Sequence, residues 1–213
     1  MNKKIVIKIG GSFINTAKRK KLKEIVKVIE NQAAAAKNIK LIIVNGGGKA
    51  ADLVRQFDNV CKIAPKNAHF AAISAVELNA YLLSDFFSEF SFFSQNLSLN
   101  KKINIFLPLD YYKEIDPLPN SWQVTSDTMA LETAKRFKVD KLILLKQKEL
   151  LKNKFSSSRA DKLSEAGIID EYFPILFKKN IADKMETVII NANYPQRIKN
   201  YLLNKNTKLT KII

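Results

Sequence analysis

Strand-like and helix-like stretches alternate along the chain. Short apolar runs rich in β-branched residues are typical of buried strands, and apolar positions three and four residues apart are typical of half-buried helices. Leu22, Ile25, Val26 and Ile29 show the helical spacing, with lysines on much of the opposite face. The pattern predicts strands at 3–9, 39–44, 102–108, 141–145 and 187–192, and helices around 22–29, from 49, over 67–86, up to about 138 and over 194–203.

This alternation predicts an α/β fold, a three-layer sandwich around a mainly parallel sheet. We expect one domain over residues 1–213, in two lobes at about 1–118 and 119–213, because a proline-containing stretch at 115–121 separates the two halves. Residues 146–187 are less regular, and 207–213 is expected to form an edge strand. Ligands of such sheets gather at the carboxyl ends of the strands.

The first two predicted strands both end in glycine clusters, which hold five of the six glycines. Gly10, Gly11 and Ser12 follow the first strand, and Gly46, Gly47 and Gly48 follow the second. Glycine lets the backbone approach a ligand, and a following helix N-terminus attracts phosphate. Tight turns alone also need glycine, but equivalent clusters on two strands favour a phosphate cradle. Neither cluster matches a P-loop or a dinucleotide fingerprint.

Two further features carry charge close to these turns. Lys8 lies inside the first strand, where it either meets an anion or belongs to an edge strand. Thr125, Ser126, Asp127 and Thr128 stand at a predicted helix start. They are read either as ordinary N-cap residues or as a carboxylate and hydroxyls placed beside phosphates.

Composition narrows the class of protein. The 213 residues are 46% hydrophobic with a formal charge of +16, which suggests an anionic partner or a lysine-rich source. No base-reading motif is present, so nucleic acid is not favoured. The single cysteine excludes a disulfide framework and a cysteine-based zinc cluster, and the single histidine disfavours a histidine-rich metal site. No membrane span or signal peptide is apparent, and the cytosol is the expected compartment.

Aromatic residues and the two unique side chains leave alternatives open. Trp122 either stacks on a ligand ring or packs in the core. His69 is expected in a packed helix, and Cys61 as a small core residue. The phenylalanines of the stretch 86–93 form either core, an interface or a lid over an apolar substrate.

Three segments together resemble the amino acid kinase superfamily, which includes acetylglutamate, aspartate, uridylate and isopentenyl phosphate kinases. They are KIGGS after the first strand, VNGGG after the second, and WQVTSDTMALETAKRFKVDKLILL at 122–145. The short length, the TSDT block and GIIDEYFP at 167–174 look most like a small archaeal-type branch. That branch contains an ATP-dependent kinase of methanofuran biosynthesis, a one-carbon cofactor pathway, which converts aminomethylfuran-methyl phosphate to a diphosphate.

The resemblance implies a role for each matching position. Lys8 matches the lysine that stabilises the transferred phosphoryl group. Asp127 matches the aspartate that organises this lysine and the phosphates. Gly10, Gly11 and Ser12 match the loop over the ATP phosphates, with Thr125, Ser126 and Lys146 beside the nucleotide. Gly46, Gly47, Gly48 and Thr128 match the acceptor site. ATP and Mg²⁺ are the implied cofactors, with a homo-oligomer as the implied assembly.

The chain also departs from the superfamily pattern in two places. Relatives usually continue the KLILL-type strand with T-D-V-D-G, whereas this chain has Lys146-Gln147-Lys148-Glu149-Leu150. The G-G-M-x-x-K segment with a second catalytic lysine is missing, and Lys146, Lys148 or Lys162 are candidates to replace that lysine. The expected function is phosphoryl transfer from ATP to a phosphate or carboxylate. Uridylate kinase, isopentenyl phosphate kinase and a degenerate nucleotide binder are the alternatives.

Overall fold

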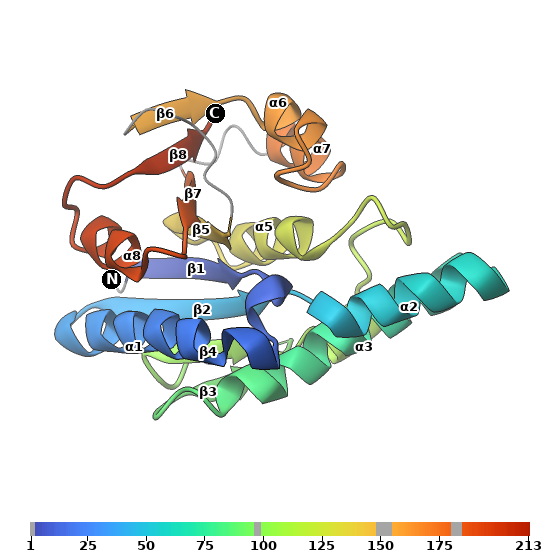
Figure 1. Cartoon of the computed structure of the whole chain (residues 1–213), viewed down its shortest axis with the longest axis horizontal. Helices are drawn as coiled ribbons and strands as arrows, with labels where there is room; N and C mark the ends of the chain where they lie inside the picture. Colours follow the sequence, from blue (N-terminus) through green and yellow to red (C-terminus); the bar gives the residue numbers. More distant parts are fainter. Residues whose placement is uncertain (1–2, 96–98, 148–154, 180–184) are drawn as a thin grey trace.

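The computed structural model describes residues 3–95, 99–147, 155–179 and 185–213, with only the backbone of 155–158. An eight-stranded sheet runs through this part of the chain in the order β3-β4-β2-β1-β5-β7-β8-β6 (Figure 1). The strands are β1 (Lys3–Ile9), β2 (Ile39–Asn45), β3 (Ser91–Phe93), β4 (Ile103–Phe106), β5 (Lys141–Lys146), β6 (Phe155–Ser158), β7 (Glu186–Asn191) and β8 (Leu209–Ile212).

Neighbouring strands from β3 to β7 are parallel, and only the β7–β8 pair is antiparallel. The predicted α/β fold with a mainly parallel sheet is therefore confirmed. The helices are α1 (Arg19–Ala35), α2 (Gly48–Cys61), α3 (Pro65–Ser84), α4 (Pro108–Glu114), α5 (Ser126–Arg136), α6 (Ala160–Glu165), α7 (Phe173–Lys178) and α8 (Pro195–Leu202). Two short 3₁₀ turns, Gly11–Phe13 and Thr16–Lys18, lie between β1 and α1.

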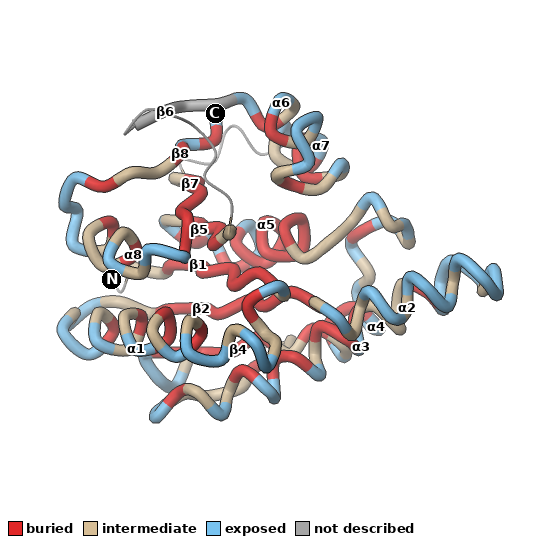
Figure 2. The backbone as a smooth tube through the Cα atoms, in the orientation of Figure 1, coloured by how far each residue is buried: buried red, intermediate tan, exposed pale blue. Residues whose placement is uncertain are grey.

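Side-chain alternation divides the core between the two faces of the sheet. Odd-numbered residues of β1, such as Ile5 and Ile7, pack with the buried stripe of α1 and with α8. Val6 points to the other face and packs with apolar residues of α5. Both faces of the central strands are therefore buried (Figure 2), as expected for parallel strands covered by helices.

The two halves of the chain meet at the centre of the sheet. Strands β1 to β4 form one side, strands β5 to β8 form the other, and β1 pairs with β5 between them. The connection from α4 to α5 contains the proline-rich stretch that was predicted as the lobe boundary. Because β1 has neighbours on both sides, Lys8 is not an edge-strand lysine.

Some local predictions need correction. The last strand, β8, lies between β7 and β6 and is not at the sheet edge. The irregular region 146–187 contains β6, α6 and α7. Cys61 is exposed rather than a core residue, because it ends a helix with no buried residue.

The phenylalanine-rich stretch belongs mainly to the core. Phe87 and Phe93 are buried. Phe86, Phe90 and Phe92 are partly buried against the apolar cluster that contains Phe87. Its last residues form β3, a strand that the pattern did not predict.

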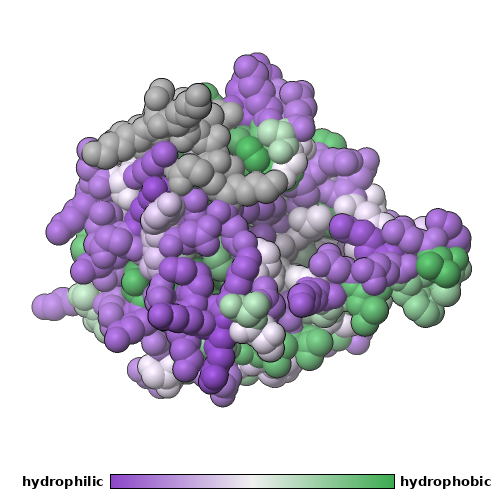
Figure 3. All heavy atoms as spheres, viewed as in Figure 1, coloured by the Kyte–Doolittle hydropathy of each residue, from purple (hydrophilic) through white to green (hydrophobic). Residues whose placement is uncertain are grey.

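Helix α2 projects from the body of the molecule (Figure 1), and its far end is among the apolar areas of the visible surface (Figure 3). Leu53, Phe57 and Val60 are exposed along it. Among the described helices, none combines the length and apolarity needed to cross a bilayer.

Candidate active site

The two glycine turns lie side by side and touch. Ile9 at the end of β1 pairs with Asn45 at the end of β2, so both turns leave the sheet at the same level. A Cβ atom on Gly11 would lie 2.2 Å from the Gly48 nitrogen, and one on Gly46 would lie 2.5 Å from the Gly11 nitrogen. Gly48 also has a φ of +50°, in the left-handed region. Only glycines allow these turns to approach so closely.

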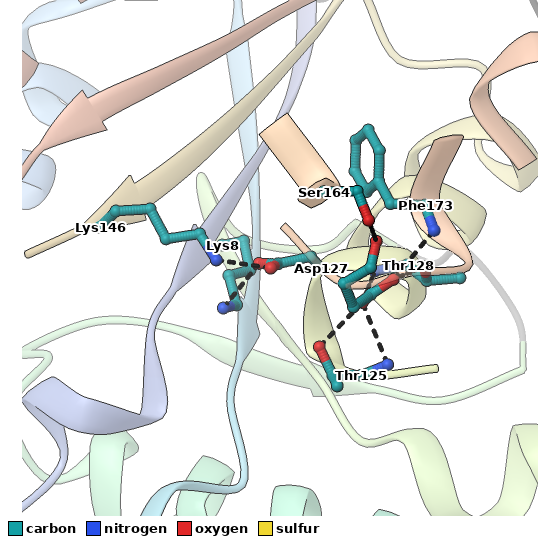
Figure 4. A network of polar contacts seen from close by, with 8 residues as sticks. Lys8, Thr125, Asp127, Thr128, Lys146, Ser164 and Phe173 are labelled. Carbon is teal, nitrogen blue, oxygen red and sulfur yellow. Dashed lines mark hydrogen bonds and ion pairs between the residues drawn. The ribbon is translucent and has the colours of Figure 1, made fainter. Parts of the chain in front are cut away.

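Asp127 forms ion pairs with two lysines, which lie at the carboxyl ends of β1 and β5 (Figure 4). The Lys8 Nζ lies 2.9 Å from Asp127 Oδ1, and the Lys146 Nζ donates to Asp127 Oδ2 at 2.5 Å. The Lys8 and Asp127 side chains are only 5% and 4% exposed, and that of Lys146 is 19% exposed. The three groups carry a net charge of +1, so the cluster suits an additional anion.

The pKa shifts follow from this geometry. Burial raises the pKa of Asp127, but the charges of Lys8 and Lys146 outweigh it and hold the pKa below its ordinary value. Burial lowers the pKa of Lys146, and the neighbouring Lys8 charge lowers it further, against the attraction of Asp127. The carboxylate is therefore ionised at neutral pH and holds two ammonium groups close together.

Asp170 fixes the start of α5, the helix that carries Asp127. It accepts hydrogen bonds from Thr125 N (3.0 Å), Thr125 Oγ1 (2.8 Å), Thr128 N (3.0 Å), Thr128 Oγ1 (2.5 Å) and Phe173 N (2.9 Å). Burial, followed by the charge of Asp127, nevertheless raises the pKa of Asp170. Asp170, from outside the helix, supplies the cap that was expected from Thr125, Ser126 or Asp127.

Gln147 joins the first glycine turn to the end of β5. Its Nε2 donates to Ser12 Oγ at 2.7 Å, and the Lys18 Nζ donates to its Oε1. Gln147 stands in the segment where relatives have T-D-V-D-G. Of the three lysine candidates, Lys146 reaches Asp127, Lys162 is exposed on α6, and Lys148 lies outside the described residues.

A cavity of about 940 Å³ opens beside the glycine turns. Its polar wall is one face of α2, and apolar residues of α3, including Ile73 and Val76, line another part. The segment 120–126 also contributes, with Trp122 among its residues. The Trp122 Nε1 donates to Asp58 Oδ2 at 2.7 Å, and the Arg55 guanidinium lies 4.7 Å from the centre of the indole ring.

The structure divides the predicted site residues into two adjacent groups. Gly11, Ser12, Gly46, Gly47, Gly48, Thr125 and Ser126 line the cavity. Lys8, Gly10, Asp127, Thr128 and Lys146 lie outside its wall. The start of α5 connects the groups, because Ser126 lines the cavity and the next residue, Asp127, pairs with both lysines.

Thr128 differs most from its expected place. It is fully buried and its hydroxyl donates to Asp170, so it supports α5 instead of facing the cavity. His69 does line the cavity, with its Nε2 3.1 Å from Asp116 Oδ1. Burial lowers the pKa of His69, although Asp116 favours its charged form.

Sequence reasoning missed Asp170, Arg55 and Asp58 as site residues. Asp170 lies more than forty residues from its threonine partners, so no local spacing connects them. Asp52, Arg55 and Asp58 repeat every three residues along α2, which was the available signal for a polar face. In the described ranges, no three or more His, Cys, Asp or Glu side chains form a group that could hold a metal ion.

Comparison with known proteins shows the family of this chain. Residues 3–168 match the profile of the amino acid kinase family. The chain is 28% identical to [5-(aminomethyl)furan-3-yl]methyl phosphate kinase of Methanocaldococcus jannaschii, over 98% of this chain and 97% of that protein.

Solved structures with the same fold include two nucleotide kinases. Uridylate kinase from Archaeoglobus fulgidus has a TM-score of 0.74 at 19% identity, covering 98% of this chain and 99% of that one. UMP kinase from Ureaplasma parvum has a TM-score of 0.72 at 17% identity, covering 100% and 99%. The chain thus belongs to the amino acid kinase family and is an ATP-dependent small-molecule kinase.

Proposed function

We propose that this kinase transfers the γ-phosphoryl group of ATP to the phosphate of a small phosphomonoester and so forms a diphosphate. The acceptor we propose is [5-(aminomethyl)furan-3-yl]methyl phosphate, on which the similar M. jannaschii enzyme is named to act. The observation that carries the proposal is the Lys8–Asp127–Lys146 cluster directly behind the two touching glycine turns.

The chemistry needs positioning and charge more than a base. An acceptor phosphate oxygen is already largely ionised at neutral pH, since the second pKa of a phosphomonoester is about 6. It attacks the γ-phosphorus, the bond from that phosphorus to the β-phosphate oxygen breaks, and ADP leaves with the electron pair. Lys8 and Lys146 offset negative charge on the transferred group, and Asp127 keeps both ammonium groups in place.

The residues present fit a polyphosphate. The cluster has an excess positive charge, and the touching turns present backbone where any side chain would collide. Gly10, Gly11 and Ser12 would hold the ATP phosphates, with Thr125 and Ser126 nearby. Mg²⁺ would be held chiefly by the phosphates themselves, as is usual for this ion, and would neutralise part of their charge.

The acceptor would lie in the cavity beside Gly46, Gly47 and Gly48. These residues lead into α2, a 14-residue helix that begins at Gly48 and whose N-terminus favours an anion. The lobe 1–118 would then bind mainly the acceptor and the lobe 119–213 mainly the nucleotide. A homo-oligomer is part of the same proposal, and sedimentation velocity measures it directly.

The test is a substrate panel with purified protein. ATP, Mg²⁺ and one acceptor at a time are incubated, and products are identified by ³¹P nuclear magnetic resonance. The acceptors are the aminomethylfuran phosphate, UMP, isopentenyl phosphate and acetylglutamate. We expect a new diphosphate with the first acceptor and little product with the others.

Two controls make this result decisive. Lys8→Met should slow product formation by about 10²–10³, whereas Lys23→Met, at an exposed lysine of α1, should not. Selective turnover of UMP or isopentenyl phosphate would replace the proposed acceptor. Tight ATP binding with no product from any acceptor would instead show a nucleotide-binding protein without turnover.

A further inference from the structure

Trp122 is the single tryptophan of the chain and it lines the cavity. The indole is half-buried, so it neither fills the core nor stands free in solvent. It belongs to the segment that leads into α5, whereas its two polar neighbours belong to α2. The sequence alone left open whether it packs in the core or meets a ligand ring, and the structure places it on the cavity wall.

Two residues of α2 hold the indole in position. Asp58 accepts the indole N–H at 2.7 Å, which fixes the ring edge, and the Arg55 guanidinium stacks at 4.7 Å from the ring centre. A tryptophan held at both its edge and its face loses little conformational freedom when a ligand arrives. Such a rigid aromatic surface suits a planar ring.

The spacing along α2 gives the reach of the ligand. Gly48 is at the start of the helix, and Arg55 is seven residues further on, which is about 10 Å along the helix axis. The glycine turns are suited to a phosphate, and α3 contributes the apolar residues Ala72, Ile73 and Val76 to the cavity wall. A ligand anchored at the turns therefore meets apolar and aromatic surface as it extends along the helix.

Building on the function proposed above, we infer that Trp122 is a specificity-determining residue, positioned by Arg55 and Asp58, and that the acceptor is a phosphomonoester carrying a planar ring. The phosphate lies at the glycine turns and the ring packs against Trp122. Acceptors without a planar ring lose this contact but keep the phosphate contacts.

Two simple phosphomonoesters of nearly equal size test this directly. Benzyl phosphate carries a planar ring and cyclohexylmethyl phosphate a puckered one. Titration calorimetry gives both affinities, and the emission of Trp122 reports contact with the ring. We expect benzyl phosphate to bind about three- to tenfold tighter to the wild type, the range typical of an aromatic pair, and to change the tryptophan emission.

Variants then assign the preference to Trp122. Trp122→Leu should bring the affinity ratio close to one, and Trp122→Phe, which keeps a flat ring but loses the hydrogen bond to Asp58, should retain part of it. Asp58→Ala should reduce the ratio because the indole is no longer fixed. Asp85→Ala, the same change at an exposed residue outside the cavity, should leave it intact. Thermal unfolding checks that each variant is folded.

The inference is wrong if the wild type binds both esters equally, or if the preference survives in a folded Trp122→Leu protein. Retention of the full ratio in Asp58→Ala would exclude the positioning role. These outcomes are independent of turnover. A protein that consumes no ATP with any phosphomonoester, yet prefers the planar ester through Trp122, would refute the proposed reaction and keep the ring site.

Discussion

Asp127→Asn is the most informative single change, because it removes the one negative charge between two lysines. The variant keeps the size of the side chain and one oxygen acceptor. Lys8 and Lys146 then face each other without a counter-ion, in a site where the Lys8 side chain is only 5% exposed. Their ammonium groups lie within roughly 7 Å of each other, given the two contacts to the same carboxylate.

The expected loss of stability is large. Like charges at that separation repel by about 2 kcal/mol at an effective dielectric constant of 20. Removing one partner of a buried ion pair typically costs about 3–5 kcal/mol, because the other charge stays buried. We therefore expect Asp127→Asn to lower the free energy of unfolding by about 3–5 kcal/mol, a large part of the usual 5–15 kcal/mol.

The pKa shifts also predict how the free energy of unfolding changes with pH. The pKa of Lys146 is already lowered in the folded protein, and it falls further once Asp127 is neutral. Between that folded pKa and the ordinary value of 10.5, the unfolded chain binds more protons, so the variant gains stability as pH rises. The wild type instead loses stability in acid, as pH falls from 3.8 through the lowered pKa of Asp127.

Urea unfolding followed by circular dichroism at pH 3, pH 7 and pH 9.5 measures these effects. Adding Lys8→Met to Asp127→Asn removes one of the two unpaired charges, so the double variant should be more stable than Asp127→Asn alone. If the second change destabilises the protein further, or if the single variant is as stable as the wild type at pH 7, the charge reasoning is refuted.

Three further changes test the remaining parts of the site. Lys8→Met should lower kcat by about 10²–10³, the usual effect of removing one donor to the transition state. The fold should be kept because Asp127 still pairs with Lys146. An unchanged kcat in a coupled ADP assay would contradict this prediction. Gly11→Ala should destabilise the protein by about 1–3 kcal/mol through overpacking and abolish activity. Gly167→Ala, with open space around it, should cost only the strain of its positive φ. Equal effects of the two changes in thermal melts would exclude the contact between the turns. Asp170→Asn should cost about 1–3 kcal/mol because amide hydrogens then face N–H donors. Asp85→Asn, at an exposed residue, is the control, and wild-type urea stability of Asp170→Asn would disprove the anchoring role.

The parallel sheet could be predicted because it depends on local pattern. Buried strands such as 39–45 have a continuous apolar run, here Leu41 to Val44, and the helices between them carry clear apolar stripes. The equivalent positions of the two glycine clusters followed from the same pattern. The short elements β3 and α7 were missed, since three- and six-residue segments contain too few positions to show a period.

Contacts between distant segments could not be predicted in the same way. Four hydrogen bonds from Thr125 and Thr128 join the start of α5 to Asp170, a residue beyond α6, and no rule of spacing links them. Thr128 had the sequence signature of a ligand-facing hydroxyl, yet the same hydroxyl satisfies a buried carboxylate. A polar residue at a helix start serves either purpose, and only tertiary packing decides which.

The contact between Lys146 and Asp127, in contrast, follows from strand register. Lys8 pairs with Leu144 in the parallel β1–β5 ladder, and both side chains share the face of Val6, toward α5. Lys146 is two residues beyond Leu144, so it points to that same face and ends at the level just above Lys8. Asp127, in the first turn of α5, then lies within reach of both. A lysine at the last position of β5 can therefore supply the charge for which relatives use a separate segment, because the sheet itself aligns the two ammonium groups.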